Sequence, residues 1–346
     1  RDVSVSKTWI GPKQDSVQVT LIKDGTPTDQ TLTLQEANEW KSSFEDLIKY
    51  DPTDGHEIVY TVQENEISDY SLQMTGDMDN GFVLTNTNTE TLSIPVTKSW
   101  IGPVQSQAQI TLVKDGALTE QTLTLNQENG WKASFDNLAK YDATDGHKIE
   151  YTIQEVPVEN YTSKITGSME DGFTVTNTNT ETVSIPVEKH WIGPMTDSVD
   201  ITLVKDEEDT ENTLVLNAQN EWKDSFENLP KYDEKDGHLI DYKIKETAVK
   251  DYTSKITGDA LNGFVVTNTN VHTISIPVQK VWVGPALDSI EVSLLRDEQE
   301  TGQVLTLTKD QEWKSSFNDL LEFDPSDGHR YVYSLKEADV PGYKSV

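Results

Sequence analysis

Each quarter of this chain places a lysine and a glutamate, and three quarters also an asparagine, where a β-strand would bury its side chains. In an extended strand alternate residues share one face. Lys7 continues the apolar face that Val3 and Val5 begin, and Glu64 and Asn86 end two later apolar alternations in the same way. Because an isolated buried charge is costly unless it is neutralised or paired, the three polar groups are expected to meet one another.

Two kinds of chemistry are open to such a set. In the first, lysine and glutamate form a buried ion pair that asparagine bridges by hydrogen bonds, and no covalent bond is made. In the second, burial lowers the pKa of the lysine, and its free amine attacks the amide carbon of asparagine. A neutral glutamic acid would hydrogen-bond the amide oxygen and pass a proton to the departing ammonia. Such a reaction runs once in each domain and is not enzymatic turnover.

The pattern recurs with a period of 91 residues, which Trp9, Trp100, Trp191 and Trp282 mark. Self-similarity at a fixed period predicts tandem domains. We predict four, called copies one to four: residues 1–90, 91–181, 182–272 and 273–346. The equivalents of Lys7, Glu64 and Asn86 are Lys98, Glu155 and Asn177 in copy two, Lys189, Glu246 and Asn268 in copy three, and Lys280 and Glu337 in copy four. The fourth asparagine would lie beyond Val346, so copy four is predicted to be truncated before its last strand and to leave Lys280 without a partner.

Short alternating segments separated by turn residues indicate an all-β sandwich in each copy. The strands expected in copy one are 3–10, 16–23, 29–34, 40–44, 57–64, 69–74 and 81–88, with a helical turn over 35–39. Trp40 and Phe44 share a face, and we expect them to pack in the core rather than to form a ligand platform. Asn88 has the same strand phase as Asn86, so it is an alternative partner for the lysine.

The segments that join the copies contain no glycine. Between Asn86 and Ile94 the chain is rich in threonine, which favours extended backbone, and Pro95 comes early in the next predicted strand. The end strands of consecutive copies therefore follow one another closely. This predicts an elongated, rather stiff and monomeric rod.

A net charge of −32 and the absence of cysteine exclude several classes of function for this chain. Strong acidity disfavours binding to nucleic acid or to an anionic membrane, and it fits solubility and mutual repulsion between copies. Without cysteine neither disulfides nor thiolate chemistry are available. No signal peptide or membrane-spanning run is visible, so no membrane insertion is expected. The chain begins inside a strand pattern, as an excerpt from a longer protein would.

A further motif, D-x-x-D-G-H, offers oxygen ligands and begins at Asp51, Asp142, Asp233 and Asp324. Calcium loops alternate their ligands, as in D-x-D-x-D-G, and this motif does not. We therefore interpret it as a turn before a strand, with weak calcium binding as the alternative. One histidine makes no zinc site, and no nucleophile elbow or phosphate loop occurs. Neither a metal nor a cofactor is expected.

Taken in order, these motifs resemble the collagen-adhesin B-type (CnaB-like) repeats of Gram-positive surface proteins. In copy one they are KTW at Lys7, LIKYDPTDGHEIVYTVQE ending at Glu64, and GFVLTNT around Asn86. The resemblance covers essentially the whole chain and implies seven-stranded inverse-immunoglobulin (transthyretin-like) sandwiches. It also implies Lys7–Asn86, Lys98–Asn177 and Lys189–Asn268 isopeptide bonds, with Glu64, Glu155 and Glu246 as proton shuttles and Glu337 as their equivalent in copy four.

The resemblance further implies a structural role. The repeats would form the stalk of an adhesin that projects an adhesive region from the Gram-positive cell wall, anchored by a signal outside this chain. A host extracellular-matrix protein would be bound by another region of the full protein. Two alternatives are that the repeats themselves bind such a ligand without isopeptide bonds, or that they accompany an enzyme. The core phase of the aromatic residues argues against the first, and the lack of a catalytic constellation argues against the second.

Overall fold

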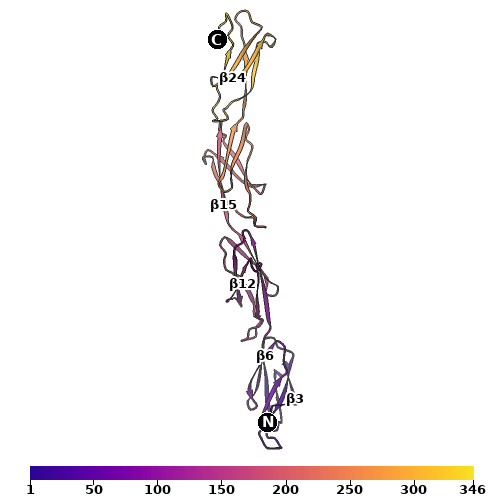
Figure 1. Cartoon of the computed structure of the whole chain (residues 1–346). Coiled ribbons are helices and arrows are strands. Elements are labelled where there is room, and N and C mark those ends of the chain that lie inside the picture. The colour runs from indigo at the N-terminus through magenta and orange to yellow at the C-terminus, as the bar shows by residue number, and fades with distance from the viewer. The chain divides into compact units, whose positions relative to one another are not determined.

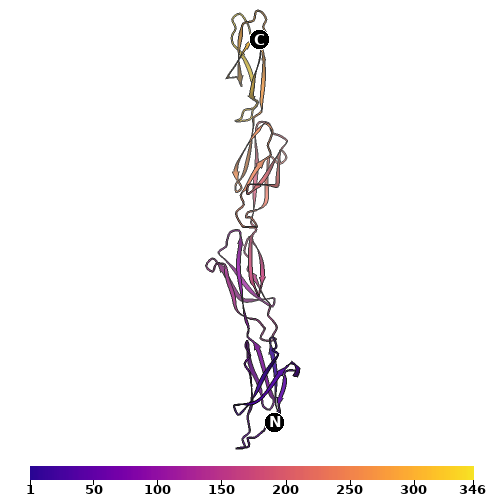
Figure 2. The same cartoon turned by 90° about the vertical axis from the view of Figure 1, so that its right-hand side faces the viewer.

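The computed structural model describes residues 1–346 and consists almost entirely of β-strands (Figures 1 and 2). Besides the strands it has two short 3₁₀ helices, η1 (Glu36–Asn38) and η2 (Lys309–Gln311). The chain divides into two compact units, one of residues 1–179 with 234–237 and one of residues 180–233 with 238–346. Each unit contains the sheets of two copies. The chain has no helix with the length and apolar character that a membrane crossing requires.

Copy one folds as two facing sheets built from seven strands. The four-stranded sheet has the order β4 (Lys41–Phe44), β1 (Val3–Ile10), β7 (Gly81–Asn88) and β6 (Tyr70–Asp77). The three-stranded sheet has the order β3 (Thr26–Gln35), β2 (Ser16–Lys23) and β5 (Tyr60–Glu64). Strands β1 and β7 are parallel, and the other neighbours are antiparallel. The first and last strands of the copy therefore lie side by side.

Copies two and three repeat this seven-stranded topology, which confirms the predicted tandem sandwiches. The strands of copy two are β8 (Thr91–Ile101), β9 (Gln107–Lys114), β10 (Ala117–Asn126), β11 (Lys132–Ala139), β12 (Tyr151–Glu155), β13 (Tyr161–Ser168) and β14 (Gly172–Asn179). Those of copy three are β15 (Thr182–Ile192), β16 (Ser198–Lys205), β17 (Glu208–Asn217), β18 (Lys223–Pro230), β19 (Tyr242–Glu246), β20 (Tyr252–Asp259) and β21 (Gly263–Asn270).

Copy four has five strands. They are β22 (Thr273–Gln279), β23 (Ser289–Arg296), β24 (Gln299–Thr308), β25 (Lys314–Leu321) and β26 (Tyr333–Glu337). Strand β22 pairs only with β25, and it ends at Gln279, whereas its counterpart β8 continues to Ile101. The missing partner is the parallel last strand, against which β1, β8 and β15 form their second halves.

The core of copy one follows the alternation that the sequence predicts. Val3 and Val5 on β1 are 0% and 2% exposed, while the intervening Ser4 is exposed. Trp40 and Phe44 are buried in the same cluster, which confirms their core role. Trp40 has a φ of 58°, in the left-handed region, so β4 begins one residue later than expected.

Candidate functional site

The three polar residues of each complete copy meet inside the sandwich. Lys7 lies on β1 and Asn86 on the neighbouring parallel strand β7, where Asn86 is opposite Trp9 and Lys7 opposite Leu84. Glu64 ends β5, which belongs to the other sheet. The glutamate therefore reaches the lysine and the asparagine from the opposite layer. The Lys7 and Glu64 side chains are 0% and 2% exposed, and Asn86 is 1% exposed.

One carboxylate holds both partners in copy one. Nζ of Lys7 lies 3.1 Å from Oε2 of Glu64, and Nδ2 of Asn86 donates to Oε1 of the same residue. The arrangement recurs in the other complete copies. The corresponding distances are 3.3 Å for Lys98–Glu155, 3.1 Å for Asn177–Glu155, 3.0 Å for Lys189–Glu246 and 3.1 Å for Asn268–Glu246. An amine, an acid and an amide are thus brought together three times. In copies two and three both partners contact Oε1 of the glutamate, whereas in copy one the lysine contacts Oε2.

Burial sets the electrostatics of the lysines. Desolvation lowers the pKa of Lys7 and of Lys189, and it lowers the pKa of Lys98 to about 8, although the paired glutamate acts in the opposite direction. The ring of Trp9 lies 4.5 Å from Nζ of Lys7, a contact that favours the ammonium form. Desolvation is the larger effect in all three complete copies, so burial shifts each amine toward its neutral, nucleophilic form.

The asparagine carbonyl oxygens are buried without a hydrogen-bond partner. These atoms are Oδ1 of Asn86, Asn177 and Asn268. An unsatisfied buried acceptor costs about 1–3 kcal/mol, and three equivalent cases require an explanation. If the side-chain amide of the asparagine rotated by half a turn, Oδ1 and Nδ2 would exchange places. Oδ1 would then face the glutamate, and a protonated glutamic acid could donate a hydrogen bond to it. That hydrogen bond would polarise the carbonyl group and prepare its carbon for attack by the amine.

Asn88, which shares the strand phase of Asn86, has a different environment. Its Oδ1 accepts the backbone N–H of Glu90 at 2.9 Å, so the side chain forms a turn after β7. Asn270 accepts the N–H of His272 in the same way. The geometry therefore favours Asn86 over Asn88 as the neighbour of the lysine.

Trp9, whose ring lies beside Nζ of Lys7, belongs to an aromatic trio whose tyrosine the sequence patterns did not indicate. Trp9 makes edge-to-face contacts with Trp40 and with Tyr70, both at 5.3 Å between ring centroids. The Tyr70 hydroxyl donates to the carbonyl oxygen of Pro12. The trio recurs as Trp100, Trp131 and Tyr161, as Trp191, Trp222 and Tyr252, and as Trp282, Trp313 and Tyr343. The tyrosine recurs with the 91-residue period of the repeat, and this recurrence is the sequence signal that could have identified it.

Copy four brings its lysine and glutamate together without an asparagine. Nζ of Lys280 lies 2.5 Å from Oε1 of Glu337, and the two side chains are 18% and 16% exposed. Both residues line an open groove with Val278 and Leu335. In copy four the lysine and glutamate are therefore partly exposed and have no amide beside them.

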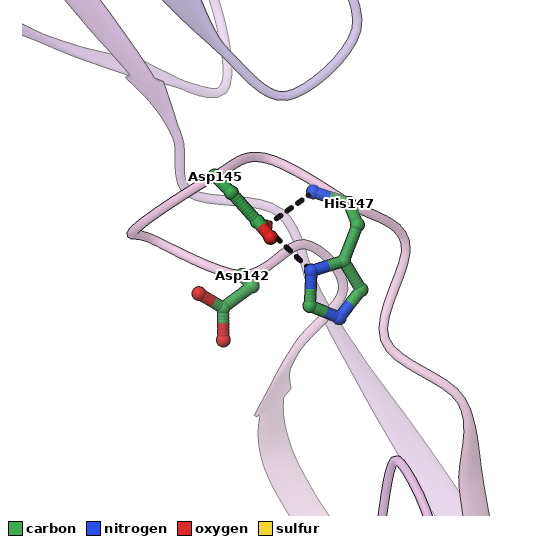
Figure 3. Close-up of side chains that lie close together, drawn as sticks. All are labelled: Asp142, Asp145 and His147. Atoms are coloured by element: carbon green, nitrogen blue, oxygen red, sulfur yellow. Dashed lines mark hydrogen bonds and ion pairs between the residues drawn. The ribbon is translucent and has the colours of Figure 1, made fainter.

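The D-x-x-D-G-H motif forms a turn whose polar groups bind one another (Figure 3). Asp145 Oδ1 accepts the N–H of His147 at 3.1 Å and lies 2.5 Å from its ring Nδ1. Asp142 Oδ2 pairs with Lys114 at 2.7 Å, and Nε2 of His147 lies 3.2 Å from Asp115. Ligand atoms of the three labelled residues lie within 4.8 Å of one another, but a cation would have to displace these partners. The structure confirms the interpretation as a turn.

Comparisons with known proteins point to one family. The family described as Cna protein B-type domain matches residues 3–87, 94–178, 185–269 and 276–346. A collagen adhesin of Staphylococcus aureus is 32% identical over 359 residues, which cover 96% of this chain and 28% of that protein. The chain therefore spans just over a quarter of the length of this relative.

Two solved structures illustrate the similarity. The crystal structure of two B repeat units (B1B2) of the collagen-binding protein of Staphylococcus aureus is 29% identical, with a TM-score of 0.36, and the match covers 99% of this chain and 95% of that one. The major pilin subunit of Bacillus cereus is 14% identical, with a TM-score of 0.24, and the match covers 78% and 92% of the two chains.

Proposed function

The chain belongs to the family of Cna protein B-type domains, and on that premise we propose that it is a self-cross-linked structural stalk of a surface adhesin. Tandem B-type repeats occur in the staphylococcal collagen adhesin that this chain matches. The observation that supports the proposal most directly is the buried lysine, glutamate and asparagine that recur in copies one to three. The four copies with the boundaries given above are the units of this stalk.

The proposed reaction joins Lys7 to Asn86 through Glu64, and it runs in the same way in copies two and three. The neutral amine Nζ attacks the asparagine Cγ, the Cγ–Nδ2 bond breaks, and a new amide forms between Nζ and Cγ. Glu64 first donates a hydrogen bond to the carbonyl oxygen. It then carries a proton from the attacking nitrogen to Nδ2, which leaves as ammonia. Packed strands hold the groups in place, and such proximity lowers the barrier by several kcal/mol. No cofactor or metal is required.

The cross-link would protect each copy from tensile force. A Lys7–Asn86 bond connects the first strand to the last, across 79 positions of the chain. Force that passes along the chain would then pass through the bond, and the residues inside the loop would stay folded. This supports a role as a stiff monomeric spacer, held at the Gram-positive cell surface through a signal outside this chain. A region outside these repeats would contact an extracellular-matrix protein of the host.

The intact mass of the chain under denaturing conditions tests the cross-links. Each bond releases one ammonia, so three bonds lower the mass by about 51 Da relative to the sequence, about 17 Da each. The Glu64→Ala variant should lose one of these three decrements. The matched variant Glu337→Ala, in copy four, should keep all three. An unmodified mass for the parent chain would contradict the cross-links and leave the buried ion pairs.

A further inference from the structure

The linkers between copies are short and are hydrogen-bonded on both sides. In the first compact unit, only Thr89 and Glu90 separate β7 from β8. The N–H of Thr89 donates to the carbonyl of Asp69 in copy one at 2.8 Å, and the carbonyl of Glu90 accepts the N–H of Lys140 in copy two at 2.9 Å. The Glu90 and Lys140 side chains also pair at 3.3 Å. A linker bonded in this way has little freedom of its own.

The second compact unit shows the same backbone bonds with different side chains. Here the linker is Val271 and His272, between β21 and β22. The N–H of Val271 donates to the carbonyl of Asp251 at 2.8 Å, and the carbonyl of His272 accepts the N–H of Glu322 at 3.0 Å. In this junction the linker carries the basic residue, His272, and the acidic residue, Glu322, lies outside the linker. The shared feature of the two junctions is therefore the backbone geometry and not the charges.

Two glycine turns approach one another beside each of these linkers. A Cβ atom added to Gly146 would lie 2.2 Å from the backbone nitrogen of Gly11, closer than real Cβ contacts come. In the other unit, a Cβ atom on Gly328 would lie 2.3 Å from the nitrogen of Gly193. Gly146 belongs to the turn drawn in Figure 3, next to Asp145 and His147. At both junctions backbone packs directly on backbone, with no room for a side chain.

Gly55 shows that this approach is not needed for the turn itself. It lies in the same T-D-G-H sequence as Gly146 and has the same φ of 79°, yet no atom lies within 4 Å of the position that its Cβ would occupy. The positive φ accounts for the glycine in both turns. The contact with the preceding copy is an additional requirement at Gly146.

We infer that the Asp-Gly-His turn of one copy is an interaction surface for the Ile-Gly-Pro turn of the preceding copy. Together with the hydrogen-bonded linker, this contact restricts bending at the junction. The restriction is independent of the isopeptide bonds, because those bonds lie within copies. It assigns to the recurring D-x-x-D-G-H motif a role in connecting the repeats.

Distance measurements between spin labels can test this inference on the whole chain. Because the chain has no cysteine, nitroxides can be attached uniquely to Gln30→Cys and Gln121→Cys, at exposed sites in copies one and two. In the Gly146→Ala variant, the 2.2 Å approach must grow to at least 3.4 Å to become an ordinary contact. The double electron–electron resonance distance distribution should shift and broaden. The Gly55→Ala control has the same backbone strain and should leave the parent distribution unchanged.

Equal distributions in the Gly146→Ala and Gly55→Ala variants would overturn the inference, and so would a parent distribution as broad as that of Gly146→Ala. The mass decrement, measured in parallel, reports the cross-links, so failure of the joint and failure of the proposed stalk chemistry are distinguishable. A melting curve would show whether Gly146→Ala prevents copy two from folding. In that case the junction between copies three and four provides the test of the inference. There Gly328→Ala is compared with the parent, with labels at Asn212→Cys and Gln303→Cys.

Discussion

Copy two and copy four contain the same lysine–glutamate pair, but they bury it to different extents. The Lys98 and Glu155 side chains are 0% and 2% exposed, whereas those of Lys280 and Glu337 are 18% and 16% exposed. The pair forms in both copies, although Lys280 lies one residue beyond β22, so the last strand is not needed to bring the amine and the acid together. Complete burial requires the parallel last strand as well, which is β14 in copy two. Since desolvation is what lowers the pKa of Lys98, the last strand supplies both the amide and the environment that activates the amine.

The largest contrast between the copies should appear in amine acylation. We expect Lys280 to be acylated in the denatured chain, and Lys7, Lys98 and Lys189 to be unreactive because their amines are consumed in amide bonds. Peptide mapping by mass spectrometry would show this. The Glu155→Ala variant should make Lys98 reactive without changing the others. Acylation of Lys98 in the denatured parent chain would support the ion pair instead of the bond.

Pulling on single molecules should separate bonded from unbonded copies by extension. An unbonded copy of 91 residues lengthens to roughly 310 Å, whereas a bonded copy releases only about 12 residues, on the order of 40 Å. The parent chain should therefore show no long steps from copies one to three. The Glu155→Ala variant should add one long step, which comes from copy two. If this step did not appear, the cross-link would not be what keeps copy two folded under force.

Removal of the lysine should destabilise copy two more than copy four. Lys98→Ala removes the cross-link of copy two and leaves Glu155 buried without its amine partner, so it should lower the free energy of unfolding of copy two by at least about 3–5 kcal/mol. Lys280→Ala affects a pair that is partly exposed to solvent, and it should cost about 1 kcal/mol or less. Calorimetric unfolding of the two variants provides the measurement. A similar decrease in the free energy of unfolding of both copies would show that the last strand does not determine how much the lysine stabilises its copy.

The smallest effect concerns the turn that copies two and four share. Hydrogen bonds, first to Asp145 and then to Asp115, raise the pKa of His147 above 6.5, and Asp327 and Asp297 act in the same way on His329. A raised pKa means that the histidine contributes stability fully below pH 6.5, and that this contribution is lost as pH rises through the folded pKa. NMR titration should give raised midpoints for both rings. A raised midpoint in only one copy would mean that the missing strand also affects the turn.

The burial of Lys7, Glu64 and Asn86 could be predicted from the sequence because a strand has a period of two. A residue in phase with buried neighbours faces the core, and a shift by one position would expose the whole apolar set. The choice between Asn86 and Asn88 could not be predicted in this way, since both have the same phase. It depends on the register of β1 against β7 and on the approach of β5 from the other sheet.

The repeat, the sandwich strands and the side chains that enter each core could be predicted from the sequence, because they follow from local periodicity and turn chemistry. The tertiary structure was needed to show which asparagine lies beside Glu64, how Tyr70 contacts Trp9, and that Gly146 approaches Gly11 whereas no atom lies near the Cβ position of Gly55. These are contacts between residues distant in the chain. Their distances depend on how strands pair and sheets pack, which no local pattern specifies.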